Sequence, residues 1–547
     1  MKSTQAIRRE KDVVNRAAME RQRLLDFLKN PASYKHGPQS VRIIETHISI
    51  VALATPSVYK FRKPVNFGWV DFSTLEKRKD DCNREIELNS RLCPEIYMTD
   101  SAVPLFEKDG RLNFEEGEIV EYCVAMHEID SDRFLGNRML DGGHIDDADF
   151  PLTQLVDRLA PFYKEASSLH FDPDTYYQNV RQPMLENLPP YQSYPIEVAV
   201  EMLDLLRYFF ETSLEKHRRL LMQRMQDGCV GDFHGDLHLQ HIVLPSQEHP
   251  SLCIFDCIEF NDAFRQIDRA ADIAFLCMDL DYRGYRKQSE AFCKAVADAL
   301  NDNGLIALQP LLRAYRACVR AKVNVLTSTN EELSPEERSA CVNTARRYVN
   351  LALRYALAGT EKKAIAVVGK VGSGKSAFAR FAASCLGVEA QSSDRIRKEL
   401  SGLPVLQPTP DVMKPLVYDE ATSEKTYNTM MELALHDAQT KGIAILDATF
   451  SSTQRRAEAI RRFSAGGIEL LFVEVSAPDR VRRERLERRR FRPNQSDART
   501  EDLSFLDAKY SAPDELPSNR IVRIDSSKGT KEETGVAAMK QLMDLLF

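Results

Sequence analysis

The stretch from Gly369 to Ser376, "GKVGSGKS", carries the clearest chemical pattern in this sequence. It matches G-x-x-x-x-G-K-[ST] and lies between an apolar run that predicts a buried strand and a segment that predicts a helix. Glycines let backbone N–H groups turn inward around phosphate oxygens, and the helix N-terminus adds positive charge. We therefore expect ATP here, with Lys375 at the β- and γ-phosphates and Ser376 on Mg²⁺. The expected nucleotide-binding residues are Gly369, Gly372, Ser373, Gly374, Lys375 and Ser376; the alternative is a glycine-rich turn without a ligand.

Asp447 ends the apolar stretch "IAILD" and is a natural partner for Mg²⁺. The next residue is Ala448, where ATP-hydrolysing motors usually place a glutamate that activates water. The absence of that glutamate argues against a hydrolytic motor and favours transfer of a phosphoryl group to a bound hydroxyl.

Asp394 and Arg397, in "SSDRIRKEL", are three residues apart, on one face of the helix that they open. A carboxylate can accept the proton of an attacking hydroxyl, and an arginine can hold an anionic substrate in bidentate fashion. We therefore predict Asp394 and Arg397 as catalytic residues. The alternative is an N-cap aspartate beside a surface arginine.

An arginine-rich stretch, "APDRVRRERLERRRFRP", follows the apolar run "IELLFVEVS". A mobile basic lid of this kind can neutralise the negative charge that spreads over a phosphoryl group in transfer. A solvated basic helix is the alternative. The arginines are Arg480, Arg482, Arg483, Arg485, Arg488, Arg489, Arg490 and Arg492.

A second set of candidates lies in the first half, in the order that a protein-kinase-like site requires. In such a site a lysine grips the α- and β-phosphates, a helix glutamate holds that lysine, one aspartate takes the hydroxyl proton and another binds Mg²⁺. "SVYKFRKPV" supplies Lys60, "CNREIELN" supplies Glu85, "HGDLHLQH" supplies Asp236 and "IFDCIEF" supplies Asp256. Taken singly, Lys60 could be a strand-edge charge and Glu85 a surface acid.

His241 departs from that pattern, because it stands five residues after Asp236, where an asparagine would hold Mg²⁺. Magnesium prefers oxygen ligands, and an imidazole replaces them poorly. We expect a packed, hydrogen-bonded His241 in a weakened or silent site. A zinc site formed by His234, His238 and His241 is the alternative. The region before Lys60 also lacks G-x-G-x-x-G.

Apolar patterns predict the elements that would position these residues. Residues 40 to 128 read as strands around one amphipathic helix, "TLEKRKDDCNREIELNSRL", and the region to about 358 is mainly helical. After Gly359, strands alternate with helices, which predicts a parallel, doubly wound sheet and a helix ended by Gly387. We expect a charged helix over residues 1–35, a bilobal α+β domain over 36–355 and an α/β domain over 360–547.

Composition limits the setting of the protein. The net charge of -7 over 547 residues provides no general attraction to nucleic acid or anionic membranes. No apolar run approaches the ~18 residues of a membrane span, and the N-terminus lacks the apolar core of a secretory signal. The 11 cysteines form no C-x-x-C pair, and we expect Cys253 and Cys257 to be buried thiols. These features favour a cytoplasmic location.

The second half resembles zeta-toxin-like and polynucleotide-kinase-like P-loop kinases in "GKVGSGKS", "SDRIR", "LDATF" and the arginine-rich stretch followed by "SDA". That resemblance implies that Asp394 is the base. The first half resembles aminoglycoside-phosphotransferase-like kinases. The whole chain resembles a bacterial two-domain family, often described only as AAA-family ATPases, in "ETHIS", "VYKFRKPV", "FSTLEKR", "HGDLHL", "IFDCIEFND" and "DIAFLCMDLD".

We therefore predict a phosphotransferase whose P-loop domain moves the γ-phosphate of ATP to an unknown hydroxyl-bearing acceptor. The kinase-like domain would be a second or a regulatory nucleotide site. Two rivals remain: an ATPase switch that controls binding of a partner, and a polynucleotide or RNA kinase. A nucleic acid partner is not favoured.

Overall fold

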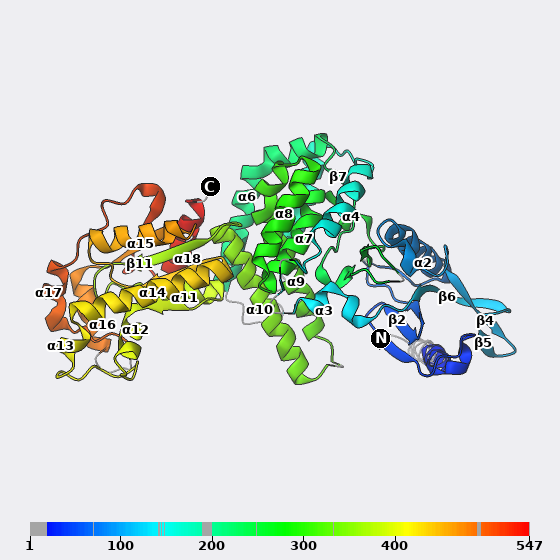
Figure 1. Cartoon of the computed structure of the whole chain (residues 1–547), viewed down its shortest axis with the longest axis horizontal. Helices are drawn as coiled ribbons and strands as arrows, with labels where there is room; N and C mark the ends of the chain where they lie inside the picture. Colours follow the sequence, from blue (N-terminus) through cyan, green and yellow to red (C-terminus); the bar gives the residue numbers. More distant parts are fainter. Residues whose placement is uncertain are drawn as a thin grey trace, which may run out of the picture. The chain divides into compact units, whose positions relative to one another are not determined.

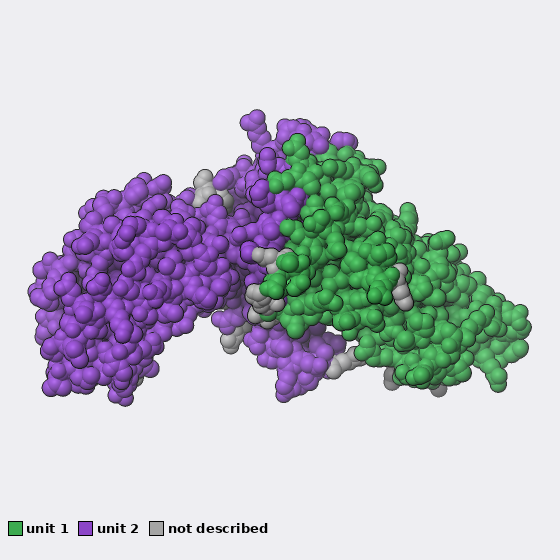
Figure 2. All heavy atoms as spheres, in the orientation of Figure 1, with its two compact units in different colours: residues 1–169, 228–279, 298–301 green, residues 170–227, 280–297, 302–547 purple. Residues whose placement is uncertain are grey.

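The structure is a computed structural model that describes residues 19–547 apart from residues 69, 141–142, 144, 147, 189–199, 248, 332, 490–493 and 546–547 (Figure 1). The chain divides into two compact units (Figure 2). Unit 1 consists of residues 1–169, 228–279 and 298–301, and unit 2 of residues 170–227, 280–297 and 302–547. No helix among the described residues has both the length and the apolar character needed to cross a membrane.

Unit 1 contains a six-stranded antiparallel sheet with the order β1-β2-β3-β6-β4-β5. Helix α2 (Leu75–Ser90) packs on one face, and residues 19–29, which are helical, contribute Leu25 and Leu28 to the core on the other face. The strands are β1 (Arg42–Glu45), β2 (Ser49–Ala54), β3 (Ser57–Arg62), β4 (Val103–Lys108), β5 (Arg111–Asn113) and β6 (Glu118–His127).

Alternation along β3 decides which side chains reach α2. Val58 belongs to the core that the sheet shares with α2, whereas Phe61 belongs to the core on the opposite face. Because side chains alternate along a strand, Lys60 and Arg62 lie on the same face as Val58. The sheet therefore presents both cations to α2, the helix that carries Glu85.

The rest of unit 1 is built from helices and two-stranded sheets. Strand β7 (Val230–Asp232) pairs with β10 (Gln266–Asp268), and β8 (Ile242–Val243) pairs with β9 (Cys253–Ile254). The loop between β7 and β8 carries "HGDLHLQH". The helical elements are η1 (Pro31–Ser33), η2 (Pro94–Ile96), η3 (Ser131–Arg133), α3 (Leu135–Arg138), α4 (Leu152–Glu165), η5 (Leu239–His241), η6 (Asp262–Phe264) and α7 (Arg269–Tyr282), whose last residues belong to unit 2.

Unit 2 contains a five-stranded parallel sheet with the order β12-β13-β11-β14-β15. Helices α14 (Glu420–Lys441) and α15 (Thr453–Ala465) share a core with one face, while α11 (Lys375–Leu386) and α18 (Lys531–Asp544) pack together against the sheet outside that core. The strands are β11 (Lys363–Val368), β12 (Ala390–Ser392), β13 (Ile443–Asp447), β14 (Glu469–Ser476) and β15 (Ile521–Asp525). Strands β11 and β13 are buried throughout, as in parallel sheets covered on both faces.

The remaining helices of unit 2 flank this sheet or support it. Asn350 of α10 donates from Nδ2 to the carbonyl oxygens of Ser384 and Cys385, at 2.9 and 2.6 Å, and so satisfies the end of α11. That end lies at Gly387, whose φ of 61° is the left-handed conformation expected of a terminating glycine. The helical elements are α5 (Pro173–Glu186), α6 (Val200–Gln226), α8 (Arg286–Leu300), α9 (Gly304–Ser328), α10 (Pro335–Ala358), α12 (Ser393–Leu400), α13 (Lys414–Val417), α16 (Asp479–Arg489), η7 (Thr500–Asp502), α17 (Leu503–Ala508) and η8 (Ser518–Arg520).

The predicted fold class is confirmed: an α+β kinase-like part precedes an α/β part with a parallel, doubly wound sheet. Of the helix expected over residues 1–35, residues 19–29 are helical, and residues 1–18 lie outside the described part. The predicted domain boundaries stay predictions. The two compact units divide the chain elsewhere, because helices of residues 170–227 and 302–358 pack with the parallel-sheet part.

The prediction of a buried thiol is wrong for Cys253, which is buried but forms a disulfide with Cys93. Their sequence separation of 160 residues hides the pairing from any local pattern. Cys257 is free and buried, as expected.

Candidate functional site

The carboxyl ends of neighbouring strands bring the C-terminal candidates together. In the parallel register Asp447 of β13 lies between Val367 of β11 and Ser392 of β12. The glycine-rich loop begins directly after β11, and α12, which carries Asp394, begins directly after β12. The parallel topology thus places the glycine-rich loop, Asp394 and Asp447 at the same edge of the sheet. Open α/β sheets bind ligands at this edge.

A cavity of about 930 Å³ lies at this edge. Its volume is near the upper end of the ~300–1,000 Å³ usual for ligand sites. The predicted residues among its lining are Gly372, Gly374, Lys375, Ser376, Asp394, Arg397 and Asp447. The sequence analysis missed Arg380, Tyr418, Tyr427 and Arg455, which also line it. The sequence gives little indication that these residues line a cavity, because arginines and tyrosines on helices usually face solvent or the core.

Backbone geometry explains the glycines of the loop. Gly369 has a φ of 138°, and a Cβ there would collide with the carbonyl oxygen of Val475. Gly374, with a φ of 107°, begins α11 in a conformation that other residues rarely adopt. The hydroxyl of Ser373 is buried and has no hydrogen-bond partner within the described chain.

Lys375 is a cation in a desolvated position, where a bound anion would stabilise its charge. Its Nζ donates to the carbonyl oxygen of Lys370 at 2.9 Å. Burial lowers the pKa of Lys375 to about 8, although the nearby carboxylates of Asp447 and Asp394 oppose that shift. A bound polyphosphate would restore the charge balance.

Ser376 and Asp447 form a pair of oxygen donors beside Lys375. The Ser376 hydroxyl hydrogen-bonds with the Asp447 carboxylate, and burial raises the pKa of Asp447 against the opposing effects of Ser376 and Lys375. A hard divalent cation such as Mg²⁺ prefers a hydroxyl and a carboxylate as ligands. The donor set therefore fits Mg²⁺.

The arginines of α16 divide by position. Arg480 and Arg483 are exposed and pair with Glu484 and Asp479 of their own helix. Of the predicted arginines, Arg490 and Arg492 lie outside the described residues.

Arg482 and Arg485 both donate hydrogen bonds to the backbone of the glycine-rich loop. Arg482 Nε donates to the carbonyl oxygen of Val371 at 2.8 Å, and Arg485 Nη1 donates to that of Ser373 at 3.1 Å. Arg485 and Arg489 both line the cavity. Burial lowers the pKa of Arg489, although Asp394 opposes the shift.

Asp394 and Arg397 both line the cavity from α12, as the spacing predicts. Arg397 is buried, and its Nη1 donates to the carbonyl oxygen of Val417 at 3.1 Å and to Ser423 Oγ at 3.0 Å. The geometry thus brings the two predicted catalytic residues to the same cavity as the phosphate-binding loop.

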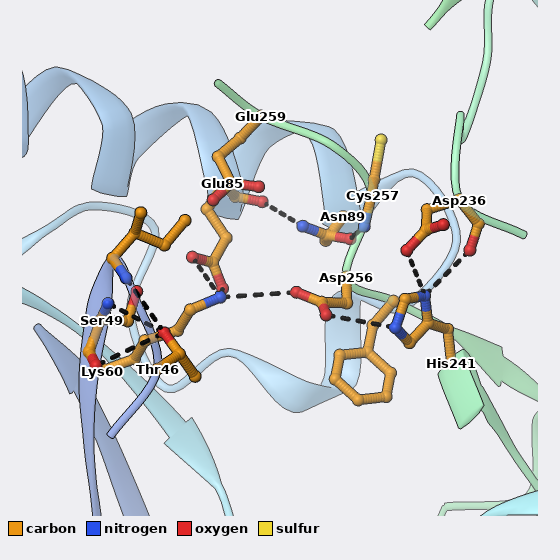
Figure 3. A network of polar contacts seen from close by, with 12 residues as sticks. Thr46, Ser49, Lys60, Glu85, Asn89, Asp236, His241, Asp256, Cys257 and Glu259 are labelled. Carbon is orange, nitrogen blue, oxygen red and sulfur yellow. Dashed lines mark hydrogen bonds and ion pairs between the residues drawn. The ribbon is translucent and has the colours of Figure 1, made fainter. Parts of the chain in front are cut away.

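The N-terminal candidates meet in unit 1 (Figure 3). Lys60 Nζ donates to Glu85 Oε1 at 3.1 Å and to Asp256 Oδ1 at 3.4 Å. Burial opposes the charge of Lys60, but Glu85 and Asp256 outweigh it and raise the pKa of Lys60. Burial likewise raises the pKa of Asp256, but Lys60 and His241 outweigh it and bring that pKa to about 2. Asp256 lies two residues after the end of β9 at Ile254, in the left-handed region with a φ of 60°.

The sequence analysis missed a buried network behind Lys60. Arg62 is fully buried and pairs with Asp81 at 2.5 Å, with Glu259 at 2.6 Å and with Glu85. Arg62 and Lys60 thus share Glu85. The alternation in "YKFR" puts Lys60 and Arg62 on one face of the strand and could have predicted that they share partners.

Two buried carboxylates of α7 anchor the loop that carries Asp236. Backbone N–H groups of His234 and Gly235 donate to Asp272, at 3.1 and 2.9 Å, and that of Leu239 donates to Asp279 at 3.0 Å. The ring of His234 donates from Nε2 to the carbonyl oxygen of Phe255 at 2.9 Å, so this histidine holds the loop against the segment that follows β9.

His241 is partly buried and hydrogen-bonded, as expected. Its Nδ1 donates to the carbonyl oxygen of Asp236 at 2.9 Å, which leaves Nε2 as an acceptor in the neutral ring. That Nε2 lies 3.2 Å from Asp256 Oδ2, also an acceptor (Figure 3). The lone pair of His241 Nε2 repels the Asp256 carboxylate, and a proton or a cation between these two atoms would remove that repulsion. The donor pair is one nitrogen and one oxygen, which fits Mg²⁺ less well than a borderline transition metal.

The predicted zinc set changes in the structure. Asp236, His238 and His241 place ligand atoms within 4.8 Å of one another, and His234 is not in this group. His238 Nδ1 accepts from the backbone N–H of Gln240, so its Nε2 carries the ring proton in the neutral form. A metal-bound histidine normally donates from its other nitrogen, so His238 is a poor ligand here.

A family described as "AAA domain" matches residues 365–513. A protein of Mycobacterium tuberculosis (strain ATCC 25618 / H37Rv), described as uncharacterized, is 29% identical over 427 residues, which are 78% of this chain and 81% of the relative.

Solved structures similar to parts of the chain include two kinases. An ethanolamine kinase of Plasmodium vivax is 10% identical and covers 57% of this chain and 81% of its own, with a TM-score of 0.33. A gluconokinase of Sinorhizobium meliloti is 18% identical and covers 34% of this chain and 95% of its own, with a TM-score of 0.24.

Proposed function

We propose that this protein is an ATP-dependent phosphotransferase whose cavity in unit 2 transfers the γ-phosphate of ATP to a hydroxyl group of a small molecule. One observation carries the proposal: Lys375, Ser376, Asp447 and Asp394 line the same cavity. The first three suit a nucleotide with Mg²⁺, and the fourth suits a proton acceptor. The match of residues 365–513 to the AAA-domain family supports nucleotide binding.

The chain's own residues divide the work of the transfer. The backbone of the glycine-rich loop and Lys375 hold the β- and γ-phosphates, and Arg489 neutralises charge that develops on the moving group. Asp394 accepts the proton as the acceptor oxygen forms its bond to the γ-phosphorus, and the bond from that phosphorus to the β,γ-bridging oxygen breaks to release ADP. When bound, Mg²⁺ supplies further neutralisation of phosphate charge beside Ser376 and Asp447.

The Lys60 site in unit 1 is proposed as a second nucleotide site with a slow or regulatory role. Lys60, Glu85 and Asp256 keep the contacts that such a site needs. His241, in the place of an oxygen ligand, weakens the expected second magnesium position.

The rival of an ATPase switch needs a group that activates water. Ala448, buried directly after Asp447, cannot do so. The nucleic-acid rival predicts binding of oligonucleotides that weakens steeply with salt. Release of ADP without any acceptor would favour the switch.

The test compares Asp394→Asn with the matched variant Glu399→Gln, which changes an exposed acid of the same helix. Labelled ATP and a metabolite extract give the transfer rate, and calorimetric titration gives ATP affinity. Asp394→Asn should slow transfer by about 10²–10⁴-fold with ATP affinity nearly unchanged, and Glu399→Gln should behave as wild type. Equal losses of binding and turnover would assign Asp394 a structural role.

A further inference from the structure

Arg397 and Arg455 both line the unit 2 cavity and form no ion pair with a carboxylate among the described residues. Arg397 uses Nη1 on Val417 and Ser423, and its guanidinium stacks on Tyr418, with the Arg397 Cζ 5.0 Å from the ring centroid. Its Nε is buried without a hydrogen-bond partner, and the residue as a whole is only 8% exposed. The direct contacts of this buried cation are all with neutral groups, and Asp419 acts on it only at longer range, so a bound anion would stabilise it.

Arg455, near the start of α15, repeats this arrangement. Its Cζ lies 4.3 Å from the centroid of the Tyr427 ring. Within the described chain its side chain makes no ion pair, although surface arginines of the same unit, such as Arg461 and Arg480, pair with glutamates of their own helices. Arg455 also lines the cavity.

Helix α14 sets the spacing of the two guanidinium groups. Arg397 contacts Ser423 and Arg455 contacts Tyr427, and these two residues are four apart on α14. They therefore lie on one face, about 6 Å apart along the helix axis. Because both arginines contact this one face, we expect one phosphate or carboxylate to reach both guanidinium groups.

This pair is distinct from the cations that surround the nucleotide phosphates. Lys375 and Arg489 belong to the glycine-rich loop and α16, and both interact with Asp394. Arg397 and Arg455 come from α12 and α15, which follow β12 and β13. Asp394 interacts with Lys375 and Arg489 and stands one turn before Arg397 on α12, so it is close to the phosphate-binding loop and to the arginine pair.

We propose that the acceptor itself carries an anionic group, a phosphate or a carboxylate, and that Arg397 and Arg455 bind this group together while its hydroxyl reaches Asp394. This deepens the proposed function and rests on it for the hydroxyl, but the anion site stands on its own contacts. The acceptor is a small molecule, because the bridging anion, Asp394 and the nucleotide share one cavity. Tyr418 and Tyr427 form its walls.

Inorganic phosphate is the probe for the binding test. The full-length protein is first saturated with a non-hydrolysable ATP analogue and Mg²⁺, so that the glycine-rich loop is occupied. Phosphorus-31 line broadening should then show saturable phosphate binding. Arg455→Gln and Arg397→Gln should each weaken it about 10–100-fold, the loss expected for a charge-assisted contact. Arg480→Gln, which removes an exposed charge, should leave it unchanged.

Further measurements distinguish the proposed transferase function from the proposed anion site and test which kind of anion binds. Analogue affinity and the melting temperature show whether a variant is folded, and Arg455→Lys should restore part of the phosphate binding. Competition by acetate would show whether a carboxylate suffices. No saturable phosphate binding in the wild type, or binding that both glutamine variants retain, overturns the anion site. Phosphate binding without transfer to any extract component would leave the anion site standing while the proposed function fails.

Transfer assays then address substrate class. Hydroxyl compounds are offered in matched pairs, neutral and phosphorylated or carboxylated. The anionic members should be preferred, and Arg455→Gln should raise KM for the acceptor while KM for ATP stays unchanged. A preference for neutral members overturns the proposal. Tighter, Arg455-dependent binding of a 5′-hydroxyl oligonucleotide than of phosphate would favour a nucleic acid acceptor and also overturn it.

Discussion

Arg482 Nε donates to the carbonyl oxygen of Val371 at 2.8 Å and ties α16 to the glycine-rich loop. The guanidinium also forms two hydrogen bonds with Asp507, at 2.7 and 2.6 Å. The arginine-rich helix is therefore not a uniform basic lid. Some of its arginines hold the loop in shape, and Arg489 lines the cavity.

Arg489→Gln should slow phosphoryl transfer about 10²–10³-fold, as expected when one donor that stabilises developing charge is removed. ATP affinity should change much less, because that contact strengthens in the transition state. Single-turnover kinetics with labelled ATP measures the transfer rate. Arg483→Gln, on the exposed side of the same helix, is the matched control. If Arg489→Gln and Arg483→Gln have equal effects, then α16 is a solvated basic helix with no role in transfer.

Lys375→Ala should weaken binding of ATP with Mg²⁺ in unit 2 about 10–100-fold, because it removes a charge-assisted contact from a buried site. Calorimetric titration of the full-length protein should show two classes of site, of which only one weakens. Lys370→Ala, an exposed residue of the same loop, is the control. If both classes of ATP site keep wild-type affinity in Lys375→Ala, then the glycine-rich loop of unit 2 is not a nucleotide site.

His241→Asn should increase magnesium-dependent ATP consumption by unit 1, because an amide oxygen replaces a nitrogen at the metal position. The background is Lys375→Ala, which silences unit 2. A gain of about 100-fold corresponds to restoring ~3 kcal/mol in the transition state. Adding Asp236→Asn should cancel the gain.

A contrary result for His241 would also be informative. If His241→Asn leaves the rate with Mg²⁺ unchanged and lowers a rate supported by Mn²⁺ or Zn²⁺, then His241 is a ligand for a softer metal. The weakened-magnesium interpretation would then be wrong.

Glu259→Gln should make the stability of unit 1 less dependent on pH. Burial raises the pKa of Glu259 to about 7 from an ordinary 4.5, although Arg62 and Lys60 oppose the shift. The folded state therefore binds the proton more tightly than the unfolded state. The resulting stabilisation is complete below pH 4.5 and is lost as the pH rises through 7.

Hydrogen exchange of β3 and α2 between pH 5 and 8, corrected for intrinsic rates, measures this effect. Protection in the wild type should fall with pH, and the fall should be smaller in Glu259→Gln. The exposed residue Glu116 supplies the control variant Glu116→Gln. Equal slopes in Glu259→Gln and wild type would show that Glu259 does not titrate in this range.

The secondary-structure elements and the chemistry of single segments follow from local sequence patterns. The strands and helices around "GKVGSGKS" follow from apolar periodicity and from glycines at left-handed positions, and both signals are local. For the same reason Lys60, on an alternating strand, and Glu85, on an amphipathic helix, were predicted in order and do form an ion pair.

Which charged residues meet depends instead on how distant elements pack in the folded chain. Arg62 finds Glu259, 197 residues away, and Cys253 finds Cys93, because packing of distant elements creates these contacts and no local pattern encodes them. The same holds for Arg397 and Arg455, which converge on one face of α14. A sequence indicates which side chains can carry charge, but burial and neighbours, which depend on the whole fold, decide whether an arginine is paired within the protein or left for a ligand.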